Sequence, residues 1–170
     1  MLPLGDCIDI VPAIIPLDLQ TARVGDFVSL KNATDCLVVV LKGIGTAGDD
    51  PVISLEQASD VAGTGVKALN EVRTFYKKIG ATAMTAISAW TRVDQTADDA
   101  LTTDILSAEG DGLWAVNIEA DQLDVDGGFD CIRVSIADVG NNPQLGAALY
   151  ILHGLRHSAA PERLPSAITD

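Results

Sequence analysis

The stretch LWAVNIEADQLDVDGGFDCIRVSIA, residues 113–137, contains two short runs in which apolar and polar side chains alternate. Successive side chains of a β-strand point to opposite faces, so a period of two predicts strands with one face in a core and one in water. Both runs have this period, and each would present a single apolar face. The residues on these faces are Trp114, Val116 and Ile118 in the first run and Ile132, Val134 and Ile136 in the second.

The acidic segment DVDGG, residues 124–128, lies between the two runs and could be a calcium loop or a tight turn. An EF-hand loop needs oxygen ligands at positions 1, 3 and 5. Counted from Asp124, Gly128 occupies position 5; counted from Asp121, Leu123 occupies position 3. Neither register works, so the sequence predicts a turn in which glycine supplies a positive φ. We expect no metal site here.

The rest of the chain also has the composition of β-strands. CLVVVLKG (36–43) is apolar on both faces, as expected of a strand that is covered on both sides. The segment 54–78 could form two helices, but its β-rich neighbours favour strands, with AGTG as a hairpin tip. We therefore expect a mainly all-β fold, an antiparallel β-sandwich or barrel of about eight strands. The remaining expectations are a hairpin of 27–31 with 36–43, one or two strands in 81–93, a polar loop over 94–104 and a last core strand in 146–155.

Proline-containing segments flank this domain at both ends. Because proline cannot donate to a central ladder, residues 1–20 are expected to form an extended arm or an edge strand. Residues 156–170 would form a second arm, leaving 21–155 as the domain. The apolar side chains of the arms need burial, either on their own core or on neighbouring subunits. The candidate contact residues are Ile14, Ile15, Leu17, Arg156, His157, Pro161, Leu164, Pro165 and Ile168.

The charge and composition exclude several classes of protein. The chain carries 24 acidic against 11 basic residues, a formal charge of -13, which disfavours nucleic acid and anionic lipid as partners. Its longest apolar run, 36–41, is too short to cross a bilayer, so we expect no membrane partner and a protein that is soluble when made. Cys7, Cys36 and Cys131 show no CxxC pairing, and we expect Cys36 and Cys131 to be small core residues.

Motifs for catalysis are also missing from the sequence. His153 and His157 are four residues apart but lack a third ligand or an HExxH pattern. No GxSxG surrounds a serine, and the glycine-rich segments 43–48 and 62–65 lack the Lys-Ser/Thr of a P-loop. The sequence therefore predicts no enzyme, no catalytic residue and no cofactor.

Four stretches resemble small structural proteins of tailed bacteriophages, and together they cover most of the chain: VPAIIPLDL (11–19), residues 24–70, EADQLDVDGGFDCIRVSIADVG (119–140) and LGAALYILHGLRHSAAPERLPSAITD (145–170). The resemblance implies a β-rich virion component without enzymatic activity that assembles through its termini and loops. The chain is short and has no long spine-like helix, unlike a major capsid protein of the common type. This departure favours a decoration or cement protein on the capsid.

Such a protein would be made in the host cytoplasm and would bind other copies of itself, most simply as a trimer, and a major capsid protein. Two alternatives remain open from the sequence. One is a head–tail connector or tail-tube subunit. The other is a calcium- or carbohydrate-binding β-sandwich that uses the loop 121–130.

Overall fold

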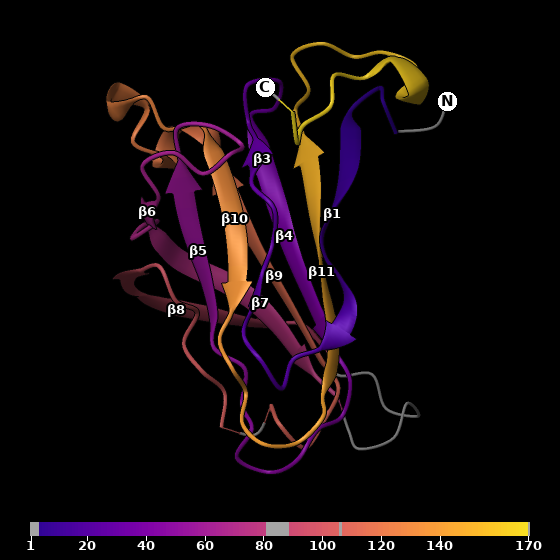
Figure 1. Ribbon diagram of the computed structural model, residues 1–170, viewed down its shortest axis with the longest axis vertical. Helices are drawn as coiled ribbons and strands as arrows, with labels where there is room; N and C mark the ends of the chain where they lie inside the picture. Colours follow the sequence, from indigo (N-terminus) through magenta and orange to yellow (C-terminus); the bar gives the residue numbers. More distant parts are fainter. Residues whose placement is uncertain (1–3, 81–88, 106, 170) are drawn as a thin grey trace.

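The computed structural model describes residues 4–80, 89–105 and 107–169, and these residues form two packed antiparallel sheets (Figure 1). The six-stranded sheet has the order β1-β11-β4-β9-β7-β8. Its strands are β1 (Ile8–Asp18), β4 (Asp35–Lys42), β7 (Val72–Ile79), β8 (Thr91–Asp98), β9 (Gly112–Glu119) and β11 (Leu145–His153).

The second sheet has the order β2-β10-β5-β6, with β3 also paired to β10. It contains β2 (Arg23–Val24), β3 (Val28–Ser29), β5 (Ile53–Ala58), β6 (Lys67–Ala68) and β10 (Cys131–Ile136). Three short 3-10 helices complete the described elements: η1 (Ala120–Gln122), η2 (Val125–Gly127) and η3 (Pro161–Arg163). The all-β fold class is thus confirmed as a sandwich, with eleven strands in the described residues rather than about eight.

The aliphatic core lies between the sheets and is built from the alternating positions that the sequence marks. The two alternating runs are β9 and β10, and their predicted inward residues are all at most 3% exposed. Cys36 and Cys131 are both fully buried, as predicted. Tyr150 of β11 joins the two sheets, because its hydroxyl donates to the Asp26 carbonyl at 3.0 Å and accepts from the Val134 amide at 2.8 Å.

The middle of the chain is all strand where it is described. β5 and β6 pair as an antiparallel hairpin with residues 59–66 between them, which confirms the strand interpretation of 54–78 and its AGTG tip. The residues 81–88 of the next expected strand lie outside the described part of the chain, and residues 91–93 belong to β8.

Two local expectations are wrong. Residues 27–31 and 36–43 do not form a hairpin, because β3 pairs with β10 in one sheet and β4 lies between β11 and β9 in the other. The short link between them crosses from sheet to sheet. Residues 94–98 belong to strand β8 and not to a polar loop, since an edge strand with little core contact tolerates polar side chains.

The N-terminal segment is an edge strand of the domain, which corrects the boundary placed at residue 21. β1 pairs with β11 over residues 8–18, with bulges between Pro12 and Ile14 and between Ile14 and Leu17. Its inward side chains, among them Val11 and Ile14, join the core. Prolines fit here because the outer side of an edge strand needs no ladder donors.

Candidate contact surfaces

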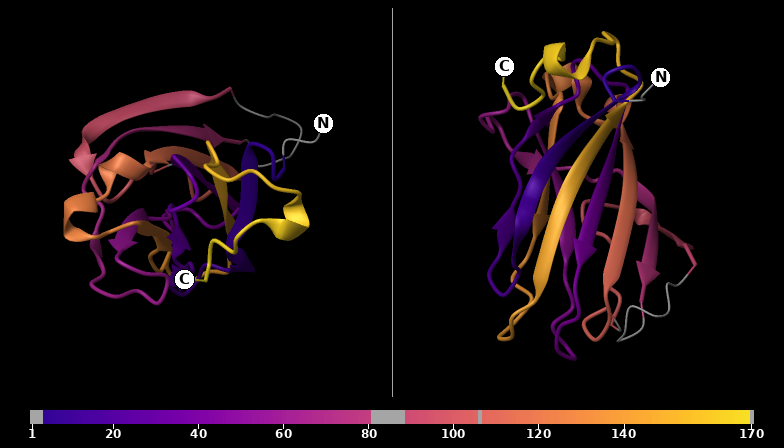
Figure 2. Two further views of the ribbon diagram at one scale, coloured as in Figure 1. Left: turned by 90° about the horizontal axis from the view of Figure 1, so that it is seen from above. Right: turned by 90° about the vertical axis from the view of Figure 1, so that its right-hand side faces the viewer.

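The C-terminal segment, residues 156–169, lies across one end of the sandwich beside the start of β1 (Figures 1 and 2). The Ser29 amide donates to the Ala167 carbonyl at 2.7 Å, and the Ala159 amide donates to the Gly5 carbonyl at 2.9 Å. Asn32 holds the start of the segment: its carbonyl accepts from the Arg156 amide at 2.9 Å and its side chain exchanges hydrogen bonds with the backbone of His157. The segment is therefore attached mainly through backbone groups.

The side chains of this segment contribute little to the core. Arg156, His157, Pro161, Pro165 and Ile168 are exposed, and Leu164 is half-buried. Of the segment's apolar residues, only Ala167 packs against the main core cluster.

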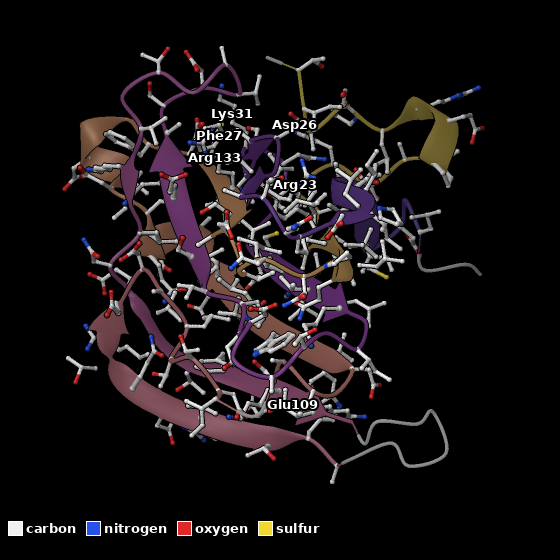
Figure 3. The ribbon with its side chains drawn as sticks, turned by 60° about the horizontal axis from the view of Figure 1, so that its bottom comes forward. Arg23, Asp26, Phe27, Lys31, Glu109 and Arg133 are labelled. Atoms are coloured by element: carbon white, nitrogen blue, oxygen red, sulfur yellow. The ribbon has the colours of Figure 1, made fainter. Side chains whose placement is uncertain are left out.

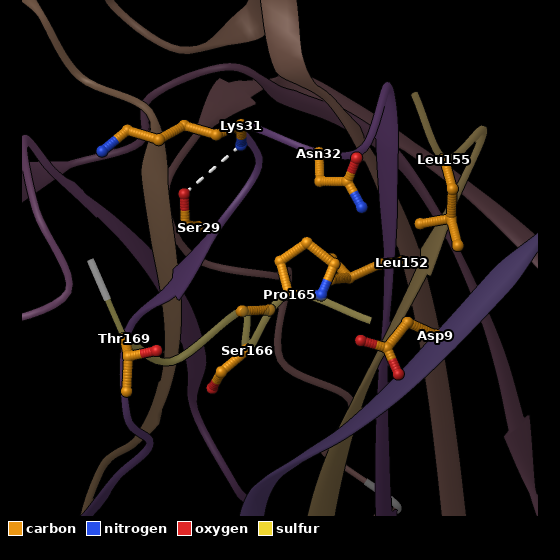
Figure 4. Close-up of a pocket in the computed structure, with 10 residues that line it drawn as sticks. Asp9, Ser29, Lys31, Asn32, Leu152, Leu155, Pro165, Ser166 and Thr169 are labelled. Atoms are coloured by element: carbon orange, nitrogen blue, oxygen red, sulfur yellow. Dashed lines mark hydrogen bonds between the residues drawn. The ribbon is translucent and has the colours of Figure 1, made fainter. Parts of the chain in front are cut away.

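A cavity of about 170 Å³ remains between the C-terminal segment and the body of the domain. Pro165 and Ser166 line one side of it, and Asn32, Leu152 and Leu155 line another (Figure 4). This volume is below the roughly 300–1,000 Å³ of typical ligand pockets. The cavity therefore indicates loose packing of the segment.

The three N-terminal candidate contact residues, Ile14, Ile15 and Leu17, do not share one surface. Ile14 is 5% exposed and belongs to the chain's own core, so its side chain is not available to a partner in this structure. Ile15 is 61% exposed and Leu17 is 37% exposed, both beside the bulges of β1. Only these two lie on the surface, because the bulges turn the strand here.

One extended apolar surface was not among the predicted contacts. Residues that pair across the six-stranded sheet form a continuous row on its outer side: Pro12, Leu149, Val39, Ala115 and Tyr76. Parallel rows lie on both sides of it. Asn117 ends one of these rows and Lys78 ends the other. We define the apolar sheet face by the apolar residues of the three rows: Ile10, Pro12, Leu37, Val39, Leu41, Tyr76, Leu113, Ala115, Ala147, Leu149 and Ile151.

No described segment lies in front of β1, β11, β4 and β9 on this side (Figure 2, right). Ile10, Leu41, Tyr76 and Leu149 are each 41–54% exposed. The signal for this face was present in the sequence: CLVVVL is apolar on both sides, whereas within the described residues only one side is covered.

Polar groups mark the two ends of the apolar sheet face. At the end near the C-terminal segment, His153 Nε2 lies 2.9 Å from Asn117 Oδ1, and Asp35 accepts from Asn117 Nδ2 at 3.2 Å. Glu119 pairs with Asp35 across the strands. At the other end, the Lys78 ammonium lies 4.6 Å from the centre of the Trp90 ring. One end is thus acidic and the other carries a cation.

The outer side of the second sheet is polar, by contrast. Arg133 donates to Glu56 at 2.6 Å and stacks over the ring of Phe27 at 4.5 Å (Figure 3). The hydroxyls of Ser54 and Ser135 are 2.8 Å apart on the same side. This sheet has the ordinary pattern of one dry and one wet face, which the six-stranded sheet lacks.

The loop DVDGG is a capped turn in the structure. Asp124 precedes η2 and accepts from the Gly127 amide at 3.0 Å, and Gly128 follows with φ +81°. Lys67 forms an ion pair with the same carboxylate and, with the Gly127 amide, lowers the pKa of Asp124. In the described part of the chain, no three His, Cys, Asp or Glu residues are grouped so that they could hold a metal ion.

At the opposite end of the sandwich from the C-terminal segment, Lys42 is 1% exposed and organises the loops. Its ammonium donates to the Gly110 carbonyl at 2.6 Å and to those of Ser107 and Ala108. Burial lowers the pKa of Lys42. The negative charges of nearby acids, Glu109 among them (Figure 3), act in the opposite direction and raise this pKa. The three donors of the ammonium are thus engaged within the chain, which indicates a structural role.

Comparisons with known proteins give little to assign a family. No protein-family model matches the chain, and no curated protein is significantly similar in sequence. Among solved structures, the SPBc2 prophage-derived protein YomS is similar with a TM-score of 0.37 and 10% identity, over 85% of this chain and 94% of that one. A likeness at this level establishes neither a shared fold nor a shared function. Within the described residues, no helix is both long and apolar enough to span a membrane.

Proposed function

We propose that this protein is a non-enzymatic structural component of a bacteriophage virion, a decoration or cement protein that binds the capsid surface. The observation that carries the proposal is the C-terminal segment, which is held by backbone bonds over a cavity and keeps Pro161, Pro165 and Ile168 exposed. A segment attached in this way can dock on a neighbouring surface at modest cost, because few packed side chains must be released. The sequence resemblance to phage structural proteins supports the same assignment.

The acidic surface fits this role. A chain with a formal charge of -13 stays soluble at the high concentration at which a virion component accumulates, and it does not compete for the packaged nucleic acid. A major capsid protein is the partner that we propose for the C-terminal segment. The calcium alternative has less support, since Lys67 already occupies the carboxylate of Asp124.

Removal of the C-terminal segment tests the proposal. We expect a chain that ends at residue 155 to remain folded, with a melting temperature lower by only a few degrees. This shortened chain should no longer cosediment with heads of the phage that encodes it. The exposed residue Ile168 gives a point variant: Ile168→Asp should weaken binding to heads at least about tenfold, as expected when a charge enters an apolar contact.

The matched control is Val125→Asp, which changes an exposed valine outside the segment, 60% exposed against 46% for Ile168. We expect it to bind heads like the unmodified protein. Full incorporation of the truncated chain would contradict the proposal. Rings in electron micrographs, in place of copies on the shell, would favour a connector or tail-tube subunit.

A further inference from the structure

The apolar sheet face is unusual on so acidic a molecule, because none of its eleven residues is charged. Charged side chains stand at its edges, with Lys78 beside Leu113 and Arg92 beside Tyr76. Its central row runs across five strands without interruption. The outer side of the other sheet shows that this sequence can make an ordinary wet face, with Arg133 and Glu56 paired across it. Exposed apolar patches of this extent mark interaction sites on soluble proteins.

We propose that the apolar sheet face binds the same face of a second copy of this chain, forming a two-fold symmetric pair. This inference stands apart from the phage assignment, since it rests only on the surface of the sheet. It also predicts a dimer, in place of the trimer that the sequence led us to expect.

The area of the face is sufficient for such a pair. Counted with the polar residues at its ends, the face spans five strands about 4.8 Å apart and about seven residues of 3.4 Å, Asp35 to Leu41 on β4, a projected area of roughly 550 Å² for each copy. Two copies would bury on the order of 1,100 Å², above the roughly 1,000 Å² expected of a biological interface. Twisted sheets pack in this manner at about -30°, as within a sandwich.

The distribution of charge favours a second copy over another occupant. The face has Asp35 and Glu119 at one end and Lys78 at the other, where Lys78 stands next to Leu113 across the strands. Consider a two-fold axis that lies in the plane of the interface and runs perpendicular to the strands. This axis reverses the strand direction between the copies, so the acidic end of one copy meets the Lys78 end of the other. This arrangement is self-complementary, as an isologous interface requires. Asp94 of β8, beside the face, is paired with Arg92 at 2.9 Å. Salt screens the repulsion between acids that are farther apart than about 8 Å at physiological ionic strength.

Sedimentation velocity of the full chain tests the pair. We expect the dimer to form at a chain concentration of about 100 μM or lower, which is within the range of affinities for interfaces of this size. Leu149→Glu and Leu41→Glu, both on the face, should raise the dimer dissociation constant at least about 100-fold, because each interface would bury two unpaired carboxylates. Val24→Glu is the matched control, because Val24 is 55% exposed on the other sheet, and it should leave the dimer intact.

A charge reversal tests the symmetry. Glu119→Lys alone should weaken the dimer, and Glu119→Lys combined with Lys78→Glu should restore it. Circular dichroism and melting curves show which variants are folded, and any folded variant of the face decides the question. A wild-type chain that stays monomeric, a trimer, or a dimer unaffected by Leu149→Glu and Leu41→Glu overturns the inference. A monomer that still binds phage heads overturns it while leaving the proposed function intact.

Discussion

The hydroxyl of Tyr150 hydrogen-bonds β11 to backbone groups of the opposite side of the sandwich, within the core. It donates to the Asp26 carbonyl and accepts from the Val134 amide, and the side chain is fully buried. Burial raises the pKa of this phenol, so it stays protonated and able to donate. A buried amide that loses its acceptor costs more than the hydrogen bond itself contributes.

Tyr150→Phe should therefore lower the free energy of unfolding by about 1–3 kcal/mol, because the Val134 amide loses its acceptor without gaining water. In a chain of this length the melting temperature would fall by about 2–10 °C. Thr96→Val, which removes an exposed hydroxyl on the edge strand β8, serves as the control and should change little. Equal melting temperatures for the two variants would contradict the role assigned to Tyr150.

At the scale of elements, the turn at 124–128 fixes how the chain passes from β9 to β10. Asp124 caps η2 and Gly128 reverses the chain in the left-handed region, with no atom within 4 Å of an added Cβ. Any cost of a side chain at Gly128 is therefore one of backbone conformation and not of steric contact. This allows the turn to be tested by itself.

Gly128→Ala should destabilise the fold by about 1–2 kcal/mol, the cost of a left-handed conformation for a residue with a Cβ. Gly43→Ala is the comparison, because Gly43 has no positive φ and the nearest atom to an added Cβ is 3.7 Å away. Chemical denaturation of both variants measures the difference. If Gly128→Ala is as stable as Gly43→Ala, the turn does not depend on this glycine.

At the scale of the whole molecule, acidic groups act on stability in two opposite ways. Backbone amides of Gln144 and Gln20 lower the pKa of Asp18, and Thr64 and Thr74 similarly lower the pKa of Asp60 and Asp94. These carboxylates have folded-state pKa values below 3.8, so their contribution to stability is present above that pH and is lost as the pH falls through the lowered values. Protonation of the many other acids relieves the repulsion that comes with a formal charge of -13.

The melting temperature should therefore stay level or rise slightly from pH 7 to about pH 5 and then fall below about pH 4. Calorimetry between pH 3 and pH 7 measures this profile. Asp18→Asn should reduce the loss below pH 4, because the amide cannot take up the proton. A melting temperature that falls steadily from pH 7, or that is unchanged at pH 3, would contradict this account.

Local patterns predicted much of the fold. The alternation in β9 and β10 placed their side chains correctly, because a period of two depends only on which side of the strand faces the core. The failures concern pairing. Residues 27–31 look like one strand of a hairpin, but β3 pairs with β10 in the other sheet. No local sequence pattern shows which distant strand a segment will pair with. Strand β8 was missed because its polar residues 94–98 lie at an edge with little to bury.

The sequence by itself determined the fold class and the chemical character of this protein: an aliphatic, acidic, all-β chain. These properties follow from composition and short-range spacing, which act on each residue wherever the chain goes. Only the tertiary structure decided that Ile14 faces the core, that the C-terminal segment lies over its own domain, and that five strands join their apolar outer sides into one face. The physical reason is that each of these depends on contacts between residues far apart in the chain, and a surface exists only once the strands that form it are side by side.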